Sequence, residues 1–304
     1  MPEIVIAGHR IADDTPCYVV AEIGHNHGGS VKLAGDLIRS AAACGAHAVK
    51  FQKRDVDALY TQALLEAPYD TDACPGRTYG AHRRALEFDY AQYVACQAVA
   101  QGAGVELFAT AFDERSADFL MTLEVPAIKI ASGAATDDHL LRYVGRLGIP
   151  MIVSTGGLTW SALDYTVSLL RACGATFALF HCTAAYPVFD FTELNLRAIL
   201  EMRRRYPDVV VGWSGHDSGI AMALVAYAFG ARIIEKHFTL NRAMQGTDHA
   251  FSLEPVGLRK LCRDLQRAHE ALGDGVKRLY ESERGPLAKM RRMLRADGRL
   301  QIGP

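Results

Sequence analysis

The most constraining feature of this 304-residue chain is a strict alternation of short apolar runs with amphipathic stretches. Eight runs rich in β-branched residues have the length of buried strands, and they cover Tyr18–Gly24, Ala48–Gln52, Val105–Ala111, Ala127–Ser132, Pro150–Thr155, Phe177–Thr183, Val209–Gly215 and Arg232–Thr239. Segments with helical periodicity separate them at about 31–44, 87–102, 113–122, 137–147, 160–172, 195–204, 218–229 and 255–272. Apolar strands in such alternation favour a parallel sheet that helices cover on both faces.

Eight such units are the number that closes a (β/α)8 TIM barrel, which is the fold class that we predict. A doubly wound open sheet is the alternative, and the lack of a G-x-G-x-x-G motif after the first strand disfavours it. The segment Ile4–Ala12 predicts a hairpin with its turn at Ala7 and Gly8, placed at the bottom of the barrel. The connection from Lys53 to Ala85 is too long for a turn, and we expect it to cover an active site.

Composition excludes several classes of partner. The net charge of −1 provides no global field for nucleic acid or an acidic membrane. The longest apolar run, Ala221–Ala231, is too short to span a bilayer. Seven cysteines without a C-x-x-C pair, and an N-terminus without a signal-peptide pattern, predict a cytoplasmic protein with free thiols.

The predicted organisation is one barrel domain over residues 1–283 and a basic C-terminal tail over residues 284–304. The tail holds six Lys or Arg residues against one acidic residue. A solvated helix is the simplest interpretation of this tail. A surface that faces an anion or a protein partner is the alternative.

Charged side chains inside the predicted strands point to chemistry. In a parallel barrel such groups are buried unless they point inward at the carboxyl ends of the strands, where barrel active sites lie. Lys50 and Lys129 lie in the second and fourth strands, and Glu22 lies in the first. Two desolvated ammonium groups need anions, so the pattern predicts a ligand that carries both a phosphate and a carboxylate. Structural ion pairs are the alternative for each lysine.

Two histidines lie at equivalent heights of consecutive strands. Neighbouring strands are about 4.8 Å apart, so the imidazole groups of His216 and His237 can reach one ion. Two histidines with further positions open to oxygen suit Mn, Fe, Co or Zn. A hydrogen-bonded pair without a metal is the alternative. His25, His27 and His249 are further candidates for this rim, and local hydrogen bonding explains them equally well.

Nine motifs, in order along the chain, make the sequence resemble the N-acetylneuraminate (sialic acid) synthase family. They are Ala21–Gly29, Val49–Gln52, Phe108–Asp113, Ile128–Gly133, Ser154–Gly157, Cys182–Pro187, Gly212–His216, Glu235–Thr239 and Gly246–Pro255. The resemblance implies a (β/α)8 barrel that condenses phosphoenolpyruvate with the open-chain aldehyde of an N-acylated hexose and releases phosphate. It also implies a homodimer and a divalent metal, commonly Mn²⁺, with Co²⁺, Fe²⁺ and Zn²⁺ as alternatives.

The resemblance assigns roles residue by residue. Lys50 and Lys129 match the lysines that hold phosphoenolpyruvate, and Glu22 matches a glutamate near the reacting carbons. His216 and His237 match the two metal ligands. The hydroxyl groups around the phosphate and carboxylate match Thr110, Ser132, Ser154 and Ser214, and the positions that bind the acceptor sugar match Gln52, Tyr186 and Asp248.

Two departures from the family pattern concern the acceptor. Family members usually continue into a small antifreeze-like domain that reaches over the partner's site and supplies an arginine to the N-acyl group. The sequence ends at Pro304, and we expect this cap domain to be absent. Lys53 stands where a small polar residue is common, and we expect it to bind the acceptor. Without the cap, a separate protein could supply it, the basic tail 284–304 could replace it, or the acceptor could lack an N-acyl group. We favour the third outcome, which predicts an acceptor other than N-acetylmannosamine, such as a non-acylated or unusually charged aldose.

Two other classes of function stay open at the level of sequence. One is a metal-dependent aldolase or isomerase on the same barrel, which would not release phosphate. The other is a catalytically silent barrel that acts as a binding partner. The intact set of lysines, histidines and hydroxyl groups disfavours the silent barrel, because a binding module does not need inward-pointing charges.

Overall fold

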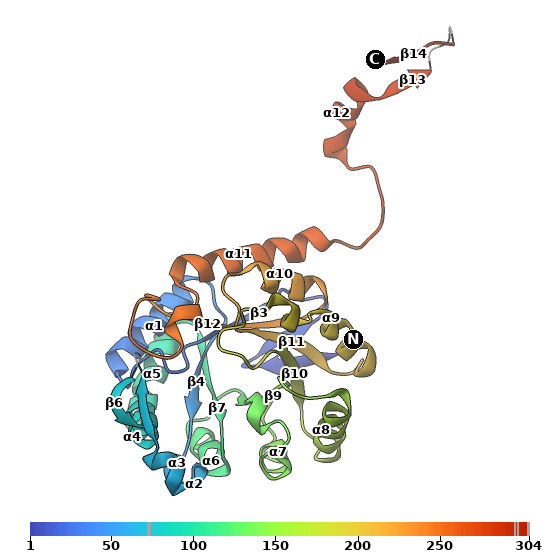
Figure 1. Cartoon of the computed structure of the whole chain (residues 1–304). Coiled ribbons are helices and arrows are strands. Elements are labelled where there is room, and N and C mark those ends of the chain that lie inside the picture. Colours follow the sequence, from blue (N-terminus) through green and yellow to red (C-terminus); the bar gives the residue numbers. More distant parts are fainter. Residues whose placement is uncertain (72–73, 295, 297, 303–304) are drawn as a thin grey trace. The chain divides into compact units, whose positions relative to one another are not determined.

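A computed structural model describes residues 1–71, 74–294, 296 and 298–302. Eight parallel strands close into a barrel in the order β10-β11-β12-β3-β4-β7-β8-β9 (Figure 1). These strands are β3 (Tyr18–Glu22), β4 (Ala48–Lys53), β7 (Glu106–Ala111), β8 (Ile128–Ile130), β9 (Met151–Ser154), β10 (Phe177–Cys182), β11 (Val210–Gly215) and β12 (Ile233–His237). The pairing of β12 with β3 closes the ring, which confirms the predicted (β/α)8 barrel and excludes the open sheet.

Helices follow the strands on the outside of the barrel. They are α1 (Val31–Ala43), α5 (Tyr90–Ala103), α6 (Glu114–Thr122), α7 (Asp138–Gly145), α8 (Trp160–Ala172), α9 (Arg197–Arg205), α10 (Ala221–Ala228) and α11 (Pro255–Leu272). Several begin at a polar residue, such as Ser30 or Asp113, whose side chain accepts a backbone hydrogen bond from the first turn. None of the described helices combines the length and the apolar content that a membrane span requires.

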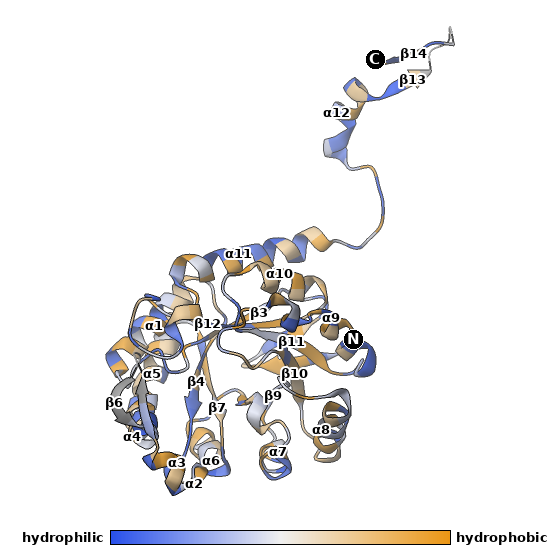
Figure 2. Ribbon diagram, viewed as in Figure 1, coloured by the Kyte–Doolittle hydropathy of each residue, from blue (hydrophilic) through white to orange (hydrophobic). Residues whose placement is uncertain are grey.

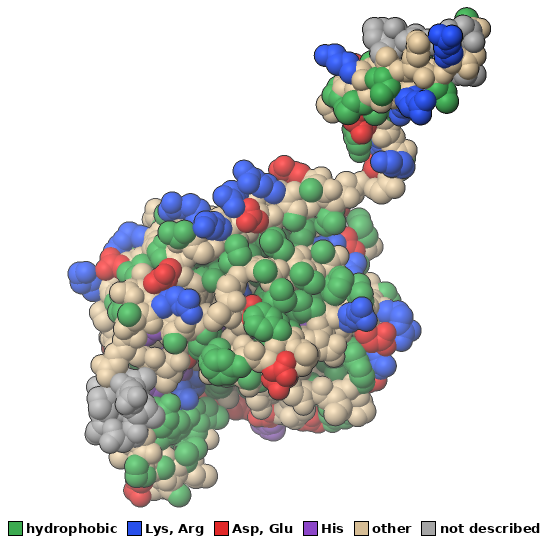
Figure 3. All heavy atoms as spheres, turned by 45° about the horizontal axis from the view of Figure 1, so that its top comes forward, with side chains coloured by type: hydrophobic (Ala, Val, Ile, Leu, Met, Phe, Trp, Pro, Cys, Tyr) green, Lys and Arg blue, Asp and Glu red, His purple; other side chains and the backbone are tan. Residues whose placement is uncertain are grey.

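Hydrophobic residues fill the interior between the strands and the helices. Figure 2 shows β10 and β11 as mostly hydrophobic, whereas the end of β4 is hydrophilic. On the barrel face drawn in Figure 3, basic and acidic side chains are interspersed around a hydrophobic area. The carboxyl end of β4 is therefore a polar exception in an apolar sheet, and it indicates the end of the barrel where a functional site is expected.

The N-terminal hairpin lies at the other end of the barrel. Strands β1 (Glu3–Ile6) and β2 (His9–Ala12) pair antiparallel around the expected turn. Ile4, Ile6 and Ile11 are buried in the core. The ring of His9 contacts those of Tyr18 and His47, which stand where β3 and β4 begin. The hairpin thus covers the amino-terminal ends of these strands, as the sequence predicts.

The long connection after β4 is structured. It contains α2 (Val56–Leu59), α3 (Gln62–Glu66), the antiparallel strands β5 (Pro68–Thr71) and β6 (Cys74–Thr78), and α4 (Tyr79–Leu86). A second compact unit spans Glu270–Pro304. It holds the expected C-terminal helix, α12 (Glu281–Met290), and a hairpin of β13 (Arg292–Leu294) and β14 (Leu300–Ile302).

Asp13 links the hairpin to the barrel, and its removal is expected to destabilise the fold. Its carboxylate accepts two hydrogen bonds of 2.8 Å from Arg203 and one of 2.9 Å from Arg232. Because charge-assisted hydrogen bonds contribute about 1.5–3 kcal/mol, Asp13→Ala should lower the melting temperature measurably at pH 7. The control is Asp14→Ala, since Asp14 is half exposed and pairs with Arg10.

The effect of Asp13→Ala should depend on pH in a defined direction. The hydrogen bonds from Arg203 lower the pKa of Asp13 below its ordinary value. A lowered pKa in the folded state means that the stabilisation is complete above the unfolded pKa of about 4 and is lost as pH falls through the folded pKa. The two melting temperatures should therefore converge under acidic conditions. Equal melting temperatures at pH 7 would contradict the role of Asp13.

Candidate active site

A cavity of about 700 Å³ opens at the carboxyl ends of the barrel strands. All the site residues predicted from the sequence except Lys53 line it, namely Glu22, Lys50, Gln52, Thr110, Lys129, Ser132, Ser154, Tyr186, Ser214, His216, His237 and Asp248. Strand register explains this convergence. Glu22 is paired with Lys50, and Thr110 with Lys129, on neighbouring strands, so that the two side chains of each pair point into the barrel together.

The two lysines form a buried network with two carboxylates. Lys50 Nζ lies 2.7 Å from Glu22 Oε2 and donates to Thr110 Oγ1 at 2.8 Å. Lys129 Nζ donates to both oxygens of Glu235, at 2.9 and 3.0 Å. Lys50 Nζ is also 3.9 Å from Glu235 Oε1, which joins the two pairs into one cluster. The protein thus supplies the counter-charges that the sequence interpretation assigned to a ligand.

The two carboxylates differ in their affinity for a proton. Burial raises the pKa of Glu22 to about 7, although Lys50 opposes the shift. Burial also acts against the charge of Glu235, but the neighbouring ammonium groups of Lys129 and Lys50 outweigh it and lower the pKa to about 2. Glu235 therefore stays ionised at neutral pH, and Glu22 is the member of the cluster that can hold or release a proton.

Glu235 is absent from the set of predicted site residues, although the sequence carries a signal for it. It stands two positions before His237 in β12. Alternate residues of a strand point to the same face, so an inward-pointing His237 implies an inward-pointing Glu235. The same argument turns Lys236 outward, where its Nζ lies 2.9 Å from Asp217 Oδ1. Lys236 is therefore a structural ion pair.

His216 and His237 have the properties of ligands for a cation. The ring centroids are 5.5 Å apart. His216 Nδ1 lies 2.8 Å from the carbonyl oxygen of Thr183, which orients the ring and leaves Nε2 to accept. His237 Nδ1 is buried without a hydrogen-bond partner, 3.6 Å from Asp248 Oδ2. Burial lowers the pKa of both rings to about 3, so both are neutral, as metal ligands must be.

These residues fit a divalent cation with an incomplete set of protein ligands. Within the described part of the chain, no cluster of three His, Cys, Asp or Glu residues is arranged to hold a metal ion. Two imidazole nitrogens would then leave the remaining coordination positions to oxygen atoms of a substrate or of water. Such an open site is typical of catalytic rather than structural metals.

The residues predicted to bind the acceptor contact Glu22 and the two histidines. Gln52 Nε2 donates to Glu22 Oε1 at 2.8 Å, and the ring of Tyr186 lies 4.2 Å from that of His216. Gly24 lies beside the side chains of Glu22 and Gln52, and its backbone has a positive φ of 51°. A Cβ at this position would lie 3.1 Å from Glu22 Oε1 and 3.2 Å from Gln52 Nε2. Glycine therefore allows both the turn and the close packing of these side chains.

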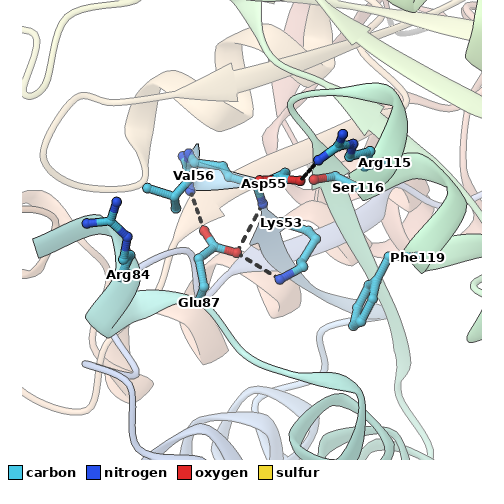
Figure 4. A pocket seen from close by; sticks show the side chains of 9 residues that line it. Lys53, Asp55, Val56, Arg84, Glu87, Arg115, Ser116 and Phe119 are labelled. Carbon is cyan, nitrogen blue, oxygen red and sulfur yellow. Dashed lines mark hydrogen bonds and ion pairs between the residues drawn. The ribbon is translucent and has the colours of Figure 1, made fainter. Parts of the chain in front are cut away.

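Lys53 is placed apart from the other predicted residues. It lines a separate pocket of about 360 Å³, where its Nζ lies 3.2 Å from Glu87 Oε2 and donates to the carbonyl oxygen of Phe88 at 3.0 Å (Figure 4). The side chain follows Gln52 directly in β4, so the two point to opposite faces of the strand. The structure does not bring Lys53 to the cavity at the barrel mouth.

The further histidine candidates separate into one cavity residue and two packing residues. His25 lines the cavity. His27 packs on the ring of Phe88 at 4.2 Å, and His249 Nδ1 lies 2.7 Å from Thr239 Oγ1. Several residues absent from the prediction also line the cavity, including Arg54, Tyr69, Arg83, Phe112, Cys182 and Thr247.

A closed (β/α)8 barrel with a cavity lined by charged groups at the carboxyl ends of its strands has the architecture of a barrel enzyme. The chain belongs to the NeuB family, whose model matches residues 37–277. This confirms the resemblance to the sialic acid synthases and identifies a sialic acid synthase-like enzyme.

The relatives span eukaryotes and bacteria. N-acetylneuraminate-9-phosphate synthase of Mus musculus is 37% identical over 276 residues, which cover 91% of this chain and 77% of that protein. N,N'-diacetyllegionaminic acid synthase of Legionella pneumophila is 32% identical over 284 residues, with 91% and 79% covered. The solved N-acetylneuraminic acid synthetase of Leptospira borgpetersenii in complex with citrate superposes with a TM-score of 0.82 at 31% identity, and the match covers 94% of this chain and 95% of that one.

Proposed function

We propose that this enzyme joins phosphoenolpyruvate to the aldehyde carbon of an open-chain aldose and releases phosphate by cleavage of a C–O bond. The observation that carries the proposal is the buried cluster of Lys50, Lys129, Glu22 and Glu235 at the barrel mouth, beside two neutral histidines. An anionic substrate and a polarised aldehyde need these two kinds of group next to each other. The names of the relatives, which are synthases of nonulosonic acids, support the same reaction.

Phosphoenolpyruvate would bind through the lysines and the surrounding hydroxyl groups. Lys50 and Lys129 offer ammonium protons to its phosphate and carboxylate. The hydroxyl donors are those of Thr110, Ser132, Ser154 and Ser214. The hydroxyl group of Ser132 is pre-oriented, since its Oγ already accepts a hydrogen bond of 3.0 Å from the backbone of Gly156. Little side-chain freedom is then lost when the anion binds.

The proposed reaction balances with one molecule of water. A bond forms between C3 of phosphoenolpyruvate and the aldehyde carbon, the oxygen of water joins C2, and the bond from C2 to the phosphate oxygen breaks. A divalent cation held by His216 and His237, which we propose to be Mn²⁺ with Co²⁺, Fe²⁺ and Zn²⁺ as alternatives, would supply Lewis acidity at the aldehyde oxygen. The carboxyl group of Glu22, next to Lys50 Nζ, would hold a proton that this water gives up.

The acceptor sugar would lie along Gln52, Tyr186 and Asp248, which line the same cavity. An acceptor other than N-acetylmannosamine stays a prediction, and so does the homodimer. A cytoplasmic location also stays a prediction. Free thiols support it, and the described cysteines that carry them are Cys17, Cys44, Cys96, Cys173, Cys182 and Cys262.

The proposed function is tested by a screen of aldoses with phosphoenolpyruvate and Mn²⁺. For a true acceptor we expect inorganic phosphate and a product heavier than the aldose by one pyruvic acid, in equal amounts. N-acetylmannosamine belongs in the panel, together with neutral and acidic aldoses. Condensation of pyruvate without consumption of phosphoenolpyruvate would instead indicate an aldolase, and would overturn the proposal.

A further inference from the structure

The loops that follow the first and the last barrel strand both reach the cavity at the barrel mouth. The ladder between β3 and β12 ends with the pair of Glu22 and His237. Beyond this pair, the first loop carries Asn26, and the second carries Asp248, which lines the cavity. The side chain of Asn26 is completely buried and has no part in the reaction steps above.

The amide group of Asn26 connects the first loop to two points of the second. Its Nδ2 donates to the carbonyl oxygen of Phe238 at 2.8 Å and to Ser252 Oγ at 2.9 Å. Phe238 directly follows β12, and Ser252 lies four residues beyond Asp248. A carbonyl oxygen can only accept, so the NH2 end of the amide must face Phe238, and the orientation of the side chain is fixed.

The bonds of Asn26 are made by its donors alone. Its Oδ1 is buried without a hydrogen-bond partner in the described part of the chain. A buried acceptor without a partner lowers the stability of the fold. The contribution of this asparagine therefore lies in the two bonds that its NH2 group donates across the two loops.

Ser252 extends the connection to Asp248. Its hydroxyl group accepts from Asn26 and donates to the backbone carbonyl oxygen of Asp248 at 2.6 Å. The two amide protons and the hydroxyl proton thus each have one acceptor. Ser252 is only 2% exposed, so water has little access to these bonds. The direction of the whole chain of hydrogen bonds runs from Asn26 to Asp248.

Asp248 is the residue whose position this chain of hydrogen bonds determines. Its Oδ2 lies 3.6 Å from His237 Nδ1 and 3.9 Å from His25 Nδ1, and its Oδ1 accepts from Thr247 Oγ1 at 2.8 Å. It stands in a loop, just before the short helix η3 (His249–Phe251), so the barrel ladder does not fix it. A shift of this loop would move the carboxylate relative to both histidines and to a sugar in the cavity.

We propose that Asn26 is a positioning residue for the acceptor, which acts through Ser252 to hold the carboxylate of Asp248 toward the hydroxyl groups of the aldose. This inference rests on the proposed function and adds a determinant of acceptor binding that does not itself line the cavity. The competing interpretation is that Asn26 only stabilises the closure of the barrel. Such a role would lower the stability without a preference for one substrate.

The first test compares the two substrates at saturating Mn²⁺. Asn26→Leu keeps the branched shape without the amide and should raise the KM for an accepted aldose at least about tenfold, whereas the KM for phosphoenolpyruvate should not change. Ser252→Ala is a milder variant that should act in the same direction. Thr166→Val is the control, because this hydroxyl group is equally buried and donates to the carbonyl oxygen of Ala135 at 2.9 Å. It should lower the melting temperature and leave both KM values unchanged.

A double-variant cycle tests whether Asn26 acts through Asp248. Asp248→Ala removes the carboxylate, so Asn26→Leu should raise the KM for the aldose no further in that background. Additive losses in the double variant would overturn the proposal. So would an equal rise of both KM values in Asn26→Leu, or an unchanged KM for the aldose in that variant.

Hydrogen–deuterium exchange separates this inference from the proposed function, because it needs no turnover. The backbone amides of residues 247–253 should exchange faster in Asn26→Leu and in Ser252→Ala than in the unaltered enzyme, while those of α8 should not. Thr166→Val, which lies in α8, should show the opposite pattern. Faster exchange of residues 247–253 would support the hold on this loop even if no aldose were turned over. Unchanged protection there in both variants would overturn it.

Discussion

Replacing His216 or His237 by alanine is expected to weaken cation binding by on the order of 100-fold or more and to abolish condensation at physiological metal concentrations. The reason is the small number of protein ligands. Two imidazole groups are proposed to hold the ion, so each substitution removes one of only two protein ligands. Chelation of the unaltered enzyme should have the same effect, and added Mn²⁺ or Co²⁺ should restore activity.

The measurement is activity as a function of free Mn²⁺, combined with Mn²⁺ affinity from electron paramagnetic resonance. His139→Ala is the control, since its ring is 89% exposed and pairs with Glu114 on the surface. Circular dichroism should show that the site variants stay folded, because both side chains line a cavity rather than the packed core. Full activity of the double alanine variant after exhaustive chelation would show that the histidines hold no catalytic cation.

Lys129→Met is expected to lower kcat/KM for phosphoenolpyruvate by about tenfold to 100-fold, because a charged hydrogen bond to the substrate is lost. The same change leaves the carboxylate of Glu235 buried without its main partner, so the variant should also melt at a lower temperature. These two effects have different causes, and a second variant separates them.

The double variant Lys129→Met/Glu235→Gln removes the charge pair as a unit. Its melting temperature should recover toward that of the unaltered enzyme, while the KM for phosphoenolpyruvate should stay high. Lys236→Met is the matched control, since Lys236 is a buried lysine on the outer face of β12 and pairs with Asp217. It should lose stability and keep its phosphoenolpyruvate kinetics. If the double variant regained normal phosphoenolpyruvate kinetics, Lys129 would be a structural residue only.

Strand periodicity made the barrel and most of the cavity predictable. Parallel strands that are covered on both faces are apolar throughout, so each charged residue inside them stood out. Register pairs Thr110 with Lys129, and the side chain of Lys50 reaches Thr110 by a hydrogen bond. The same periodicity, applied strictly, separates Glu235 and His237 from Lys236. It also separates Gln52 from Lys53, which the resemblance to the family alone had placed at the acceptor.

The partner that each lysine takes, and the approach of Arg83 to the cavity, were beyond the reach of sequence reasoning, for two physical reasons. Pairing between lysine and carboxylate depends on side-chain reach across the barrel, as for Lys129 and Glu235, and this is not contained in a linear pattern. Arg83 comes from the connection after β4, where no periodicity tells which of its many charged side chains turn toward the cavity. Arg54 and Arg83 approach the same atom of His25, although they are 29 residues apart in the chain.

The central claim is that phosphoenolpyruvate is joined to an aldehyde with loss of its phosphate through the C–O bond. The most direct measurement uses phosphoenolpyruvate with ¹⁸O in the oxygen that bridges C2 and phosphorus, incubated with the enzyme, Mn²⁺ and an accepted aldose. Mass spectrometry should find the label in inorganic phosphate and none of it in a product that is heavier than the aldose by one pyruvic acid. Label retained in the condensed product, or a product formed from pyruvate while phosphoenolpyruvate stays intact, would contradict the claim.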